Sequence, residues 1–385
     1  MIKIFRVSTV PISLNILLKG QLKYLNQFFK VTAVSGAGED LDEVAQREGV
    51  KTIPLEMQRQ ISTVNDFGSL VKLFFLLKKE KPQIVHSITP KAGLLSMLAA
   101  KFAGVPIRMH TFTGLIFPSK TGTMQKILIA MDKLLCWAAT DIYPEGKGVR
   151  KDLQKFKITN KPLKIIGNGN VNGIDLDYFN PMIVSEEQRA LLKQELGISA
   201  SDFVFVFVGR LVRDKGINEL VSAFSKFKTK NSKLLLVGPL EQELDPLLPE
   251  TLNEINNNQN IISVGFQRDI RPYLSVSDVF VFPSYREGFP NVVLQAGAMN
   301  LPCIVTNISG SNEIIIYGEN GVIIPSKDAQ GLKNAMEYFQ KNTSKVANMS
   351  SVARQYISER FEQSFVWSEL VKEYNYLLNR ETIHM

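Results

Sequence analysis

Short apolar runs alternate with longer amphipathic segments along nearly all of this 385-residue chain. Apolar runs of roughly four to eight residues fit β-strands, and longer amphipathic segments fit helices. The strands expected in the first half lie at 2–8, 30–36, 50–56, 83–89, 107–113, 141–146 and 163–169, and those in the second half at 203–210, 233–238, 260–266, 279–284, 303–307 and 321–326. Helices are expected between them, including 14–29, 65–80, 122–139, 216–229 and 327–341.

Nearly continuous apolar strands that alternate with helices are typical of parallel sheets covered on both faces. The alternation stops once, between residues 172 and 201, and then restarts. The pattern predicts an α/β protein with two doubly wound domains, at 1–175 and 176–360, and a last helix within 361–385 that returns to the first domain. Because ligands of such sheets gather at the carboxyl ends of the strands, two facing domains predict a deep cleft between them.

Composition favours a cytoplasmic protein without disulfides. The chain has two cysteines, Cys136 and Cys303, which form no disulfide framework and make a zinc site unlikely. The opening residues, MIKIFRVSTV, are too short and too charged for a signal peptide and fit a first strand. No apolar run approaches the roughly 20 residues that span a bilayer, so any membrane contact is expected to be peripheral, at the inner face.

Charge is distributed unevenly between the two halves. Residues 1–180 contain 25 Lys/Arg and 14 Asp/Glu, a net charge of +11, whereas the remainder contains 20 and 23, a net charge of −3. A solvated surface explains this excess, and so does a face that meets anionic lipid or a diphosphate-bearing partner. No nucleic-acid motif accompanies the charge, so nucleic acid is not an expected partner.

Two cations follow the first strand of the second half, in the run FVFVFVGRLVRDKGINEL. Gly209 and Arg210 end the strand, and Lys215 immediately precedes the next helix. A helix N-terminus offers unpaired N–H groups and the positive end of a dipole, so cations beside it favour a diphosphate. When this motif is considered by itself, the alternative is that Arg210 and Lys215 are solvated surface side chains without a ligand.

A second strand, turn and helix carry the run YREGFPNVVLQ. Glycine at 288 allows a ligand to approach the backbone, and Pro290 pre-sets the entry into the helix. The amides of Asn291 and Val292 would then be donors at the helix start. Glu287 precedes this turn, and the side chain of Gln295 points back toward it, so both can reach one elongated ligand.

On these motifs the sequence resembles the family 4 retaining glycosyltransferases of the GT-B fold, in which two Rossmann-like domains face each other. Further likeness lies in TVPISLNILLKGQLKYL, GNGNVNGIDLDYFNP and HSITPKAGLLSMLAAKFAGVPIRMHTFTG, the last close to bacterial enzymes of capsular or O-antigen polysaccharide synthesis. The likeness covers nearly the whole chain. The family pattern of a Glu, seven residues and a second Glu is followed from Glu287, with Gln295 as the departure.

The resemblance implies roles by position. Arg210 and Lys215 would bind the donor diphosphate and stabilise it as it leaves, Glu287 would contact donor-sugar hydroxyls, and Gln295 would contact the ribose. The residues expected to bind the donor are Gly209, Gly265, Phe266, Gly288, Phe289, Pro290, Asn291, Val292 and Gln295. Pro11, Ile12 and Ser13 match the loop near phosphate and acceptor, where they replace a frequent Gly-Gly pair.

Three basic side chains of the first half have two readings each. His110 follows the fifth strand, where related enzymes place a histidine near the donor sugar, and it is expected to face the cleft; a structural histidine is the alternative. His86 lies within an apolar run and is more often structural. Lys91 begins a helix at a strand end, where it could meet an acceptor phosphate or simply be solvated.

No metal or other cofactor is expected. Asp175, Leu176 and Asp177 spell the metal-binding D-x-D of another glycosyltransferase fold, but here they follow NGI at the domain boundary and are expected to be turn residues. The expected reaction transfers a hexosyl or N-acetylhexosaminyl residue from a nucleoside diphosphate sugar, UDP by family frequency, to a polyprenyl-diphosphate-linked saccharide. The alternatives are a nucleotide-sugar 2-epimerase of the same fold and a catalytically silent nucleotide-sugar-binding partner.

Overall fold

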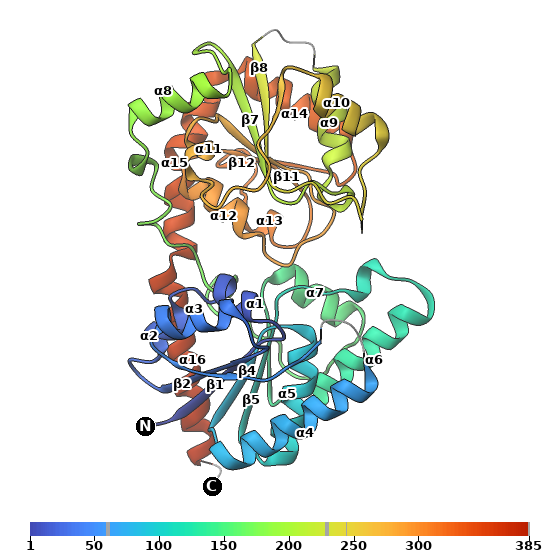
Figure 1. Ribbon diagram of the computed structural model, residues 1–385, viewed down its shortest axis with the longest axis vertical. Coiled ribbons are helices and arrows are strands. Elements are labelled where there is room, and N and C mark those ends of the chain that lie inside the picture. Colours follow the sequence, from blue (N-terminus) through green and yellow to red (C-terminus); the bar gives the residue numbers. More distant parts are fainter. Residues whose placement is uncertain (59–61, 228–230, 244, 384–385) are drawn as a thin grey trace. The chain divides into compact units, whose positions relative to one another are not determined.

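The computed structural model describes residues 1–58, 62–227, 231–243 and 245–383 (Figure 1). Contacts divide the chain into two compact units, Met1–Gly173 with Gln363–Met385 (unit 1) and Ile174–Glu362 (unit 2). The chain therefore passes between the units at 173–174 and 362–363, within about two residues of the expected boundaries. Residues 384–385 of the expected last helix lie outside the described residues.

Unit 1 contains a six-stranded parallel sheet in the order β3-β2-β1-β4-β5-β6. Its strands are β1 (Lys3–Val7), β2 (Lys30–Ser35), β3 (Lys51–Pro54), β4 (Ile84–Ser87), β5 (Ile107–Phe112) and β6 (Asp141–Pro144). Its helices are α1 (Pro11–Leu17), α2 (Gln21–Leu25), α3 (Glu39–Glu48), α4 (Thr63–Glu80), α5 (Pro90–Ala103), α6 (Gly122–Ala138), α7 (Lys147–Lys155) and the C-terminal α16 (Gln363–Ile383). The apolar side of α16 packs into the core beneath β1 and β4, where Tyr374 is fully buried.

Two secondary-structure predictions for unit 1, one of a helix and one of a strand, were wrong. The helix expected at 14–29 is broken into α1 and α2 at Gly20, whose φ of +80° places it in the left-handed region. A Cβ on this glycine would lie 2.7 Å from the ring of Trp367 in α16, so the break also makes room for the C-terminal helix. The strand expected at 163–169 does not form; Leu163 makes one isolated bridge to Ile142 of β6.

Unit 2 repeats the topology, with the order β12-β11-β10-β7-β8-β9. Its strands are β7 (Phe203–Val208), β8 (Ser232–Val237), β9 (Ile261–Ser263), β10 (Val279–Phe282), β11 (Cys303–Thr306) and β12 (Gly321–Ile324). Its helices are α8 (Glu186–Glu195), α9 (Ile217–Lys226), α10 (Pro249–Asn257), α11 (Arg271–Ser275), α12 (Asn291–Ala298), α13 (Ser311–Ile314), α14 (Ala329–Lys341) and α15 (Thr343–Phe361). The prediction of two doubly wound α/β domains is confirmed.

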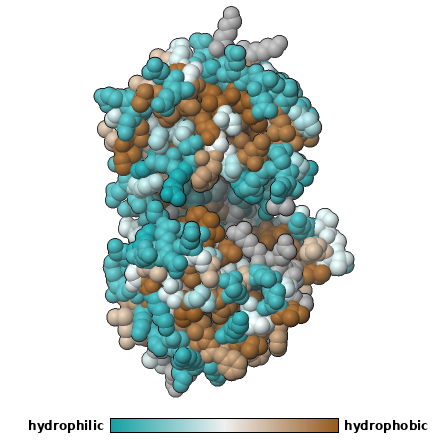
Figure 2. All heavy atoms as spheres, in the orientation of Figure 1, coloured by the Kyte–Doolittle hydropathy of each residue, from teal (hydrophilic) through white to brown (hydrophobic). Residues whose placement is uncertain are grey.

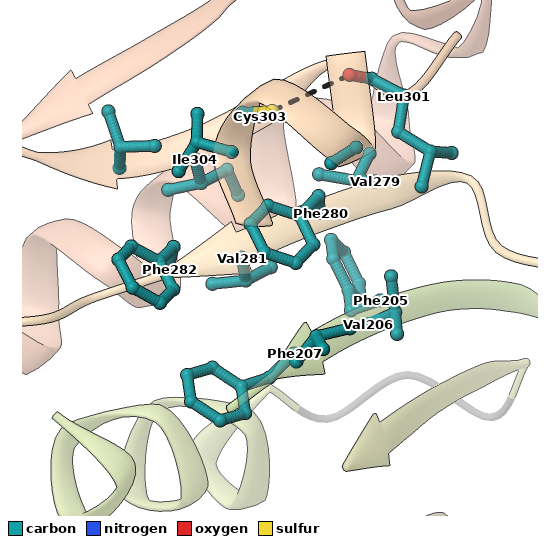
Figure 3. Close-up of a cluster of buried hydrophobic side chains, with 14 of the residues drawn as sticks. Phe205, Val206, Phe207, Val279, Phe280, Val281, Phe282, Leu301, Cys303 and Ile304 are labelled. Carbon is teal, nitrogen blue, oxygen red and sulfur yellow. Dashed lines mark hydrogen bonds between the residues drawn. The ribbon is translucent and has the colours of Figure 1, made fainter. Parts of the chain in front are cut away.

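Aromatic side chains fill the centre of unit 2, where β7 and β10 pair (Figure 3). Phe207 and Phe282 stack with ring centroids 6.0 Å apart, and Phe280 stacks on Phe282 at 5.9 Å. Burying each such ring contributes roughly 1.5–3 kcal/mol. The two central strands are thus anchored by their side chains on both faces, and their carboxyl ends hold the turns that follow.

Candidate functional site

The turn between β7 and α9 lies against the end of β10. Its last glycine, Gly216, has a φ of +74°, and a Cβ at this position would lie 2.2 Å from the carbonyl oxygen of Pro283. Only glycine permits so close an approach. A short 3₁₀ turn, η3 (Arg213–Lys215), precedes it and directs Lys215 toward the residues that follow β10.

Lys215 and Glu287 form an ion pair between Nζ and Oε1. The same carboxylate oxygen accepts a hydrogen bond of 2.8 Å from the hydroxyl of Ser284. The Lys215 side chain is 18% exposed and that of Glu287 is 17% exposed, so the pair is shielded but open to a ligand. The structure therefore brings together two of the residues that the sequence assigned to donor chemistry.

Arg210 also faces a carboxylate. Its Nη1 lies 2.8 Å from Oε2 of Glu241, which follows β8. Two further pairs lie on the same turns: Arg213 with Asp245 at 3.3 Å, and Arg286 with Asp214 at 3.0 Å. Each of these four cations thus has a carboxylate partner, which the sequence analysis did not anticipate for any of them.

The turn before α12 is held by a close backbone contact. Gly310 has a φ of +75°, and a Cβ there would lie 2.5 Å from the carbonyl oxygen of Gly288 and 2.7 Å from Cδ of Pro290. The turn leads into the first amides of α12, among them that of Val292, which have no carbonyl four residues earlier in the helix. Gly310 is a positioning residue that the sequence analysis missed; its signal was a glycine just before the start of a helix.

The expected donor residues at this turn differ in accessibility. The Phe289 ring is 7% exposed and packs on Phe361, with centroids 5.4 Å apart, so only its backbone can meet a ligand. Asn291 and Gln295 are partly exposed on α12. Among the described residues the Gln295 side chain has no hydrogen-bond partner, which leaves its amide available to a ligand.

Three glycines connect the turns after β7, β8 and β9. The Gly209 N–H donates to the carbonyl of Val237 at 2.9 Å, and the Gly238 N–H donates to that of Gly265 at 2.8 Å. Gly238 has a φ of +150°, and a Cβ on it would lie 1.8 Å from the Gly209 carbonyl oxygen. Gly238 was not predicted, although a glycine followed by proline at a strand end was visible in LLLVGP.

Beside these glycines the ring of Phe266 is 72% exposed. An exposed aromatic ring offers an apolar face on which a planar base can stack. Gly265, with a φ of +67° and open space where a Cβ would stand, precedes it. The loop predicted to surround the base thus has an accessible ring and an unobstructed backbone.

The sequence predicted that His110 follows the fifth strand and faces the cleft, but the structure places it within β5, enclosed by its neighbours. It is 1% exposed, its Nδ1 lies 2.8 Å from the Ser87 hydroxyl, and its ring packs edge-on against Phe112 with centroids 4.5 Å apart. A Cβ on Gly93 of α5 would lie 2.4 Å from this ring, so α5 covers it. Burial lowers the pKa of His110 to about 3. The other ring nitrogen, Nε2, is buried and has no hydrogen-bond partner among the described residues.

The other predicted residues of unit 1 lie at the starts of helices. Pro11, Ile12 and Ser13 form the first turn of α1, in which Ile12 is 40% exposed. Lys91, in the first turn of α5, is 8% exposed and contacts both carboxylate oxygens of Asp66 at 2.8 and 3.0 Å. A phosphate that binds Lys91 must therefore compete with Asp66 of α4.

His86 belongs to a buried polar cluster around Arg6. Arg6 is 0% exposed, and its guanidinium donates to His86 Nδ1, to the Tyr374 hydroxyl at 3.0 Å and to Gln21 Oε1 at 3.1 Å. The other imidazole nitrogen lies 2.8 Å from the Thr111 hydroxyl. Burial, and then the charge of Arg6, lower the pKa of His86 well below its ordinary value. The cluster fastens α16 to the sheet.

The D-x-D sequence forms a turn. Asp175 Oδ1 accepts hydrogen bonds from the amides of Asp177 and Tyr178 at 3.1 and 2.9 Å. Among the described residues no group of three or more His, Cys, Asp and Glu side chains is arranged to hold a metal ion. Over the same residues, no helix has the length and hydropathy needed to cross a bilayer.

Comparison with known proteins identifies the class of this chain. Residues 12–144 match the model of the glycosyl transferase 4-like family, and residues 188–356 match that of the glycosyl transferases group 1. The chain is 32% identical over 382 residues to the capsular polysaccharide biosynthesis glycosyltransferase CapM of Staphylococcus aureus, which covers 98% of this chain and 97% of that protein. The chain therefore belongs to this family of glycosyltransferases, and the expected resemblance is confirmed.

Further relatives and solved structures agree with this assignment. The chain is 33% identical over 283 residues to the UDP-Gal:alpha-D-GlcNAc-diphosphoundecaprenol alpha-1,3-galactosyltransferase of Escherichia coli, which covers 72% of this chain and 71% of that protein. A glycosyltransferase of Rickettsia africae has a TM-score of 0.82 at 20% identity, with 98% of each chain covered. HepE of Anabaena, solved in complex with UDP, has a TM-score of 0.82 at 18% identity, with 97% of this chain and 100% of that chain covered. The fold is the GT-B fold of these enzymes.

Proposed function

We propose that this glycosyltransferase moves a sugar from a UDP-sugar to a lipid-linked saccharide in the synthesis of a cell-surface polysaccharide, with retention of anomeric configuration. The observation that carries the proposal is the pairing of Lys215 with Glu287 across the turns after β7 and β10; Arg210 lies on the first of these turns, and the second leads into α12. A cation for the leaving diphosphate and a carboxylate for sugar hydroxyls stand there side by side.

The donor's diphosphate would bind Arg210 and Lys215, while Glu287 would turn its free acceptor sites to the sugar hydroxyls. As the bond from the anomeric carbon to the phosphate oxygen breaks, negative charge grows on the phosphate, and cations fixed at that point lower the barrier. The acceptor hydroxyl forms the new bond on the same face, and its proton passes to the departing phosphate oxygen. This route needs no side-chain base and no metal.

The rest of the nucleotide would lie along unit 2. The base would stack on Phe266, near Gly209, Gly238 and Gly265, and the ribose would meet Gln295. An amide at this position accepts through its oxygen but only donates through its nitrogen, whereas a glutamate accepts through both oxygens. The UDP complex of HepE and the UDP-Gal named for the Escherichia coli relative support uridine as the nucleotide.

The acceptor would bind unit 1, with its phosphate on Lys91. The names of two relatives support a diphosphoundecaprenol-linked acceptor: the Escherichia coli galactosyltransferase and, at 24% identity, an N-acetylgalactosaminyltransferase of Campylobacter jejuni. The name of CapM supports capsular polysaccharide as the product class. A lipid-linked acceptor would bring the enzyme to the inner face of the cytoplasmic membrane.

Unit 1 has an exposed surface suited to that contact. Four apolar side chains of α4 share one face at helical spacing: Val64, Phe67, Val71 and Phe75, which are 81, 67, 36 and 64% exposed. On α6 a second exposed row consists of Met124, Ile127, Leu134 and Trp137, and α5 packs against both helices. Brown and tan side chains lie among teal ones on the face of unit 1 seen in Figure 2.

Lysines flank both rows, and apolar side chains among lysines favour an anionic bilayer surface. Co-sedimentation with vesicles containing phosphatidylglycerol is expected at low salt and should decrease at high salt. The double variant Phe67→Ser/Phe75→Ser should reduce binding at both salt concentrations. Failure of the wild-type chain to bind these vesicles at any salt concentration would remove the membrane contact from the proposal.

The reaction itself is tested by incubating the protein with UDP- and GDP-sugars, with and without polyprenyl-diphosphate saccharides, and analysing the products by mass spectrometry. An acceptor one sugar heavier is the expected product. A new UDP-sugar formed without acceptor would identify an epimerase instead. Donor binding without either product, over a broad acceptor panel, would favour the silent binding partner.

A further inference from the structure

Glu241 stands where the donor's diphosphate is proposed to bind. Its Oε2 lies 2.8 Å from Nη1 of Arg210, and the two side chains are 38% and 50% exposed. Arg210 therefore already holds a carboxylate in this structure. A guanidinium presents the same N–H groups to a carboxylate and to a phosphate.

The backbone fixes this pairing. Leu211, next to Arg210, forms an isolated parallel bridge with Leu240, next to Glu241, and the Leu211 N–H donates to the Pro239 carbonyl at 2.8 Å. Just before these residues, Gly238 and Gly209 are in contact too close for any side chain. The turns after β7 and β8 are thus joined at adjacent positions, which keeps the carboxylate of Glu241 within reach of Arg210.

The exposure of the pair makes it exchangeable. A half-exposed ion pair has a small net stability, because water solvates both partners when they separate. A diphosphate can therefore take the place of the carboxylate without unfolding the turn. Once the diphosphate leaves, the carboxylate can return to Arg210.

We propose that Glu241 is a positioning residue that competes with the donor diphosphate for Arg210. It occupies the guanidinium in the empty site, releases it when the nucleoside diphosphate binds, and takes it back when the product nucleoside diphosphate leaves. Glu241 thereby weakens donor affinity and speeds product release. This inference rests on the proposed function, since it requires that unit 2 binds a nucleoside diphosphate.

The test compares two variants of one loop. Glu241→Gln removes the competing charge but keeps the size of the side chain. Glu243→Gln removes the same charge two residues away, from an exposed side chain that has no ion pair or hydrogen bond with the described residues. UDP affinity is measured by isothermal titration calorimetry, and UDP release by stopped-flow displacement, on both variants and on the wild-type chain.

We expect Glu241→Gln to bind UDP about 3- to 10-fold more tightly than the wild type, chiefly through slower release, and Glu243→Gln to change affinity less than twofold. Unchanged or weaker UDP binding by Glu241→Gln would overturn the role of Glu241. An equal gain in both variants would also overturn it, since the effect would then be one of general charge. If the wild type binds neither UDP nor GDP, the proposed function fails, and this inference fails with it.

Discussion

The two units share one topology but differ in the exposure of the polar side chains on and after their central strands. In unit 1 Arg6, His86 and His110, from β1, β4 and β5, are buried, and each hydrogen-bonds to a neighbouring side chain. In unit 2 the turn after β7 carries Arg210 and Lys215, and their carboxylate partners Glu241 and Glu287 follow β8 and β10; water can reach all four side chains. The topology fixes where polar side chains gather, and burial decides whether they hold the fold or remain available to a ligand.

The largest expected effect is a loss of stability when a buried polar residue of unit 1 is replaced. Arg6→Met removes a donor from three neutral partners, and each unpartnered buried polar group costs about 1–3 kcal/mol. Relief from burying a cation offsets part of that loss. We expect the free energy of unfolding in urea to fall by about 3–5 kcal/mol. Arg150→Met, which changes a partly exposed arginine of the same unit, should cost less than about 0.5 kcal/mol; equal losses would deny Arg6 its structural role.

The next largest effect is a loss of activity when an accessible cation of unit 2 is replaced. Lys215→Ala should lower kcat by about 10²–10³-fold, as expected when one preorganised group that stabilises developing charge is lost. Stability should also fall, by about 1–3 kcal/mol, because Glu287, which is 17% exposed, loses its ion-pair partner. Lys226→Ala, which removes an exposed lysine at the end of α9, is the matched control and should keep normal activity. Near-normal sugar transfer by Lys215→Ala would contradict its assignment.

The buried histidines predict a loss of stability in acid. His110 is neutral when folded because burial lowers its pKa to about 3. The unfolded chain takes up this proton below about pH 6.5, so the contribution is complete above that pH and falls as the pH decreases toward 3. Near pH 5 the loss should be about 2 kcal/mol. His110→Gln should show a smaller decrease between pH 7.5 and 5 in urea unfolding; an unchanged pH dependence would mean that His110 is not buried as a neutral group.

The smallest effect concerns the ribose. Gln295→Glu should restore an acceptor for both ribose hydroxyls and tighten donor binding by about 2- to 10-fold, which corresponds to one hydrogen bond. Turnover at saturating donor should stay within about twofold, because the ribose is remote from the broken bond. Steady-state kinetics over a range of donor concentrations separates the effect on donor binding from the effect on turnover. A large change in kcat with unchanged KM would place Gln295 in the chemistry instead.

The fold of this protein could be predicted from its sequence because the spacing of apolar residues follows which side chains are buried. The apolar runs at β7 and β10 are short and rich in Val and Phe, which favours strands buried on both faces, and the glycines and cations after them marked the turns of the site. The strand expected at 163–169 does not form. The apolar composition of a segment does not reveal whether it will pair with the edge strand of a sheet, here β6. The helix expected at 14–29 is two helices, because Gly20, which has a positive φ and lies against Trp367, separates α1 from α2.

The site was predicted less completely than the fold. The sequence identified Arg210, Lys215 and Glu287 but neither Glu241 nor the two ion pairs, because an ion pair between residues 31 or 72 positions apart leaves no local pattern. His110 was expected to follow the fifth strand and face the cleft, as the resemblance implied, with a structural histidine as the alternative; it lies within β5 instead. Its burial depends on Gly93 of α5, which is distant in the sequence, and on edge-on packing against Phe112 of the same strand.

We propose that unit 2 holds the donor diphosphate on Arg210 and Lys215. A crystal structure of this protein with UDP tests it most directly. We expect phosphate oxygens within about 3 Å of the Arg210 guanidinium and Lys215 Nζ, with the uracil ring on Phe266. A diphosphate bound in unit 1, or one in unit 2 that touches neither cation, would contradict the claim.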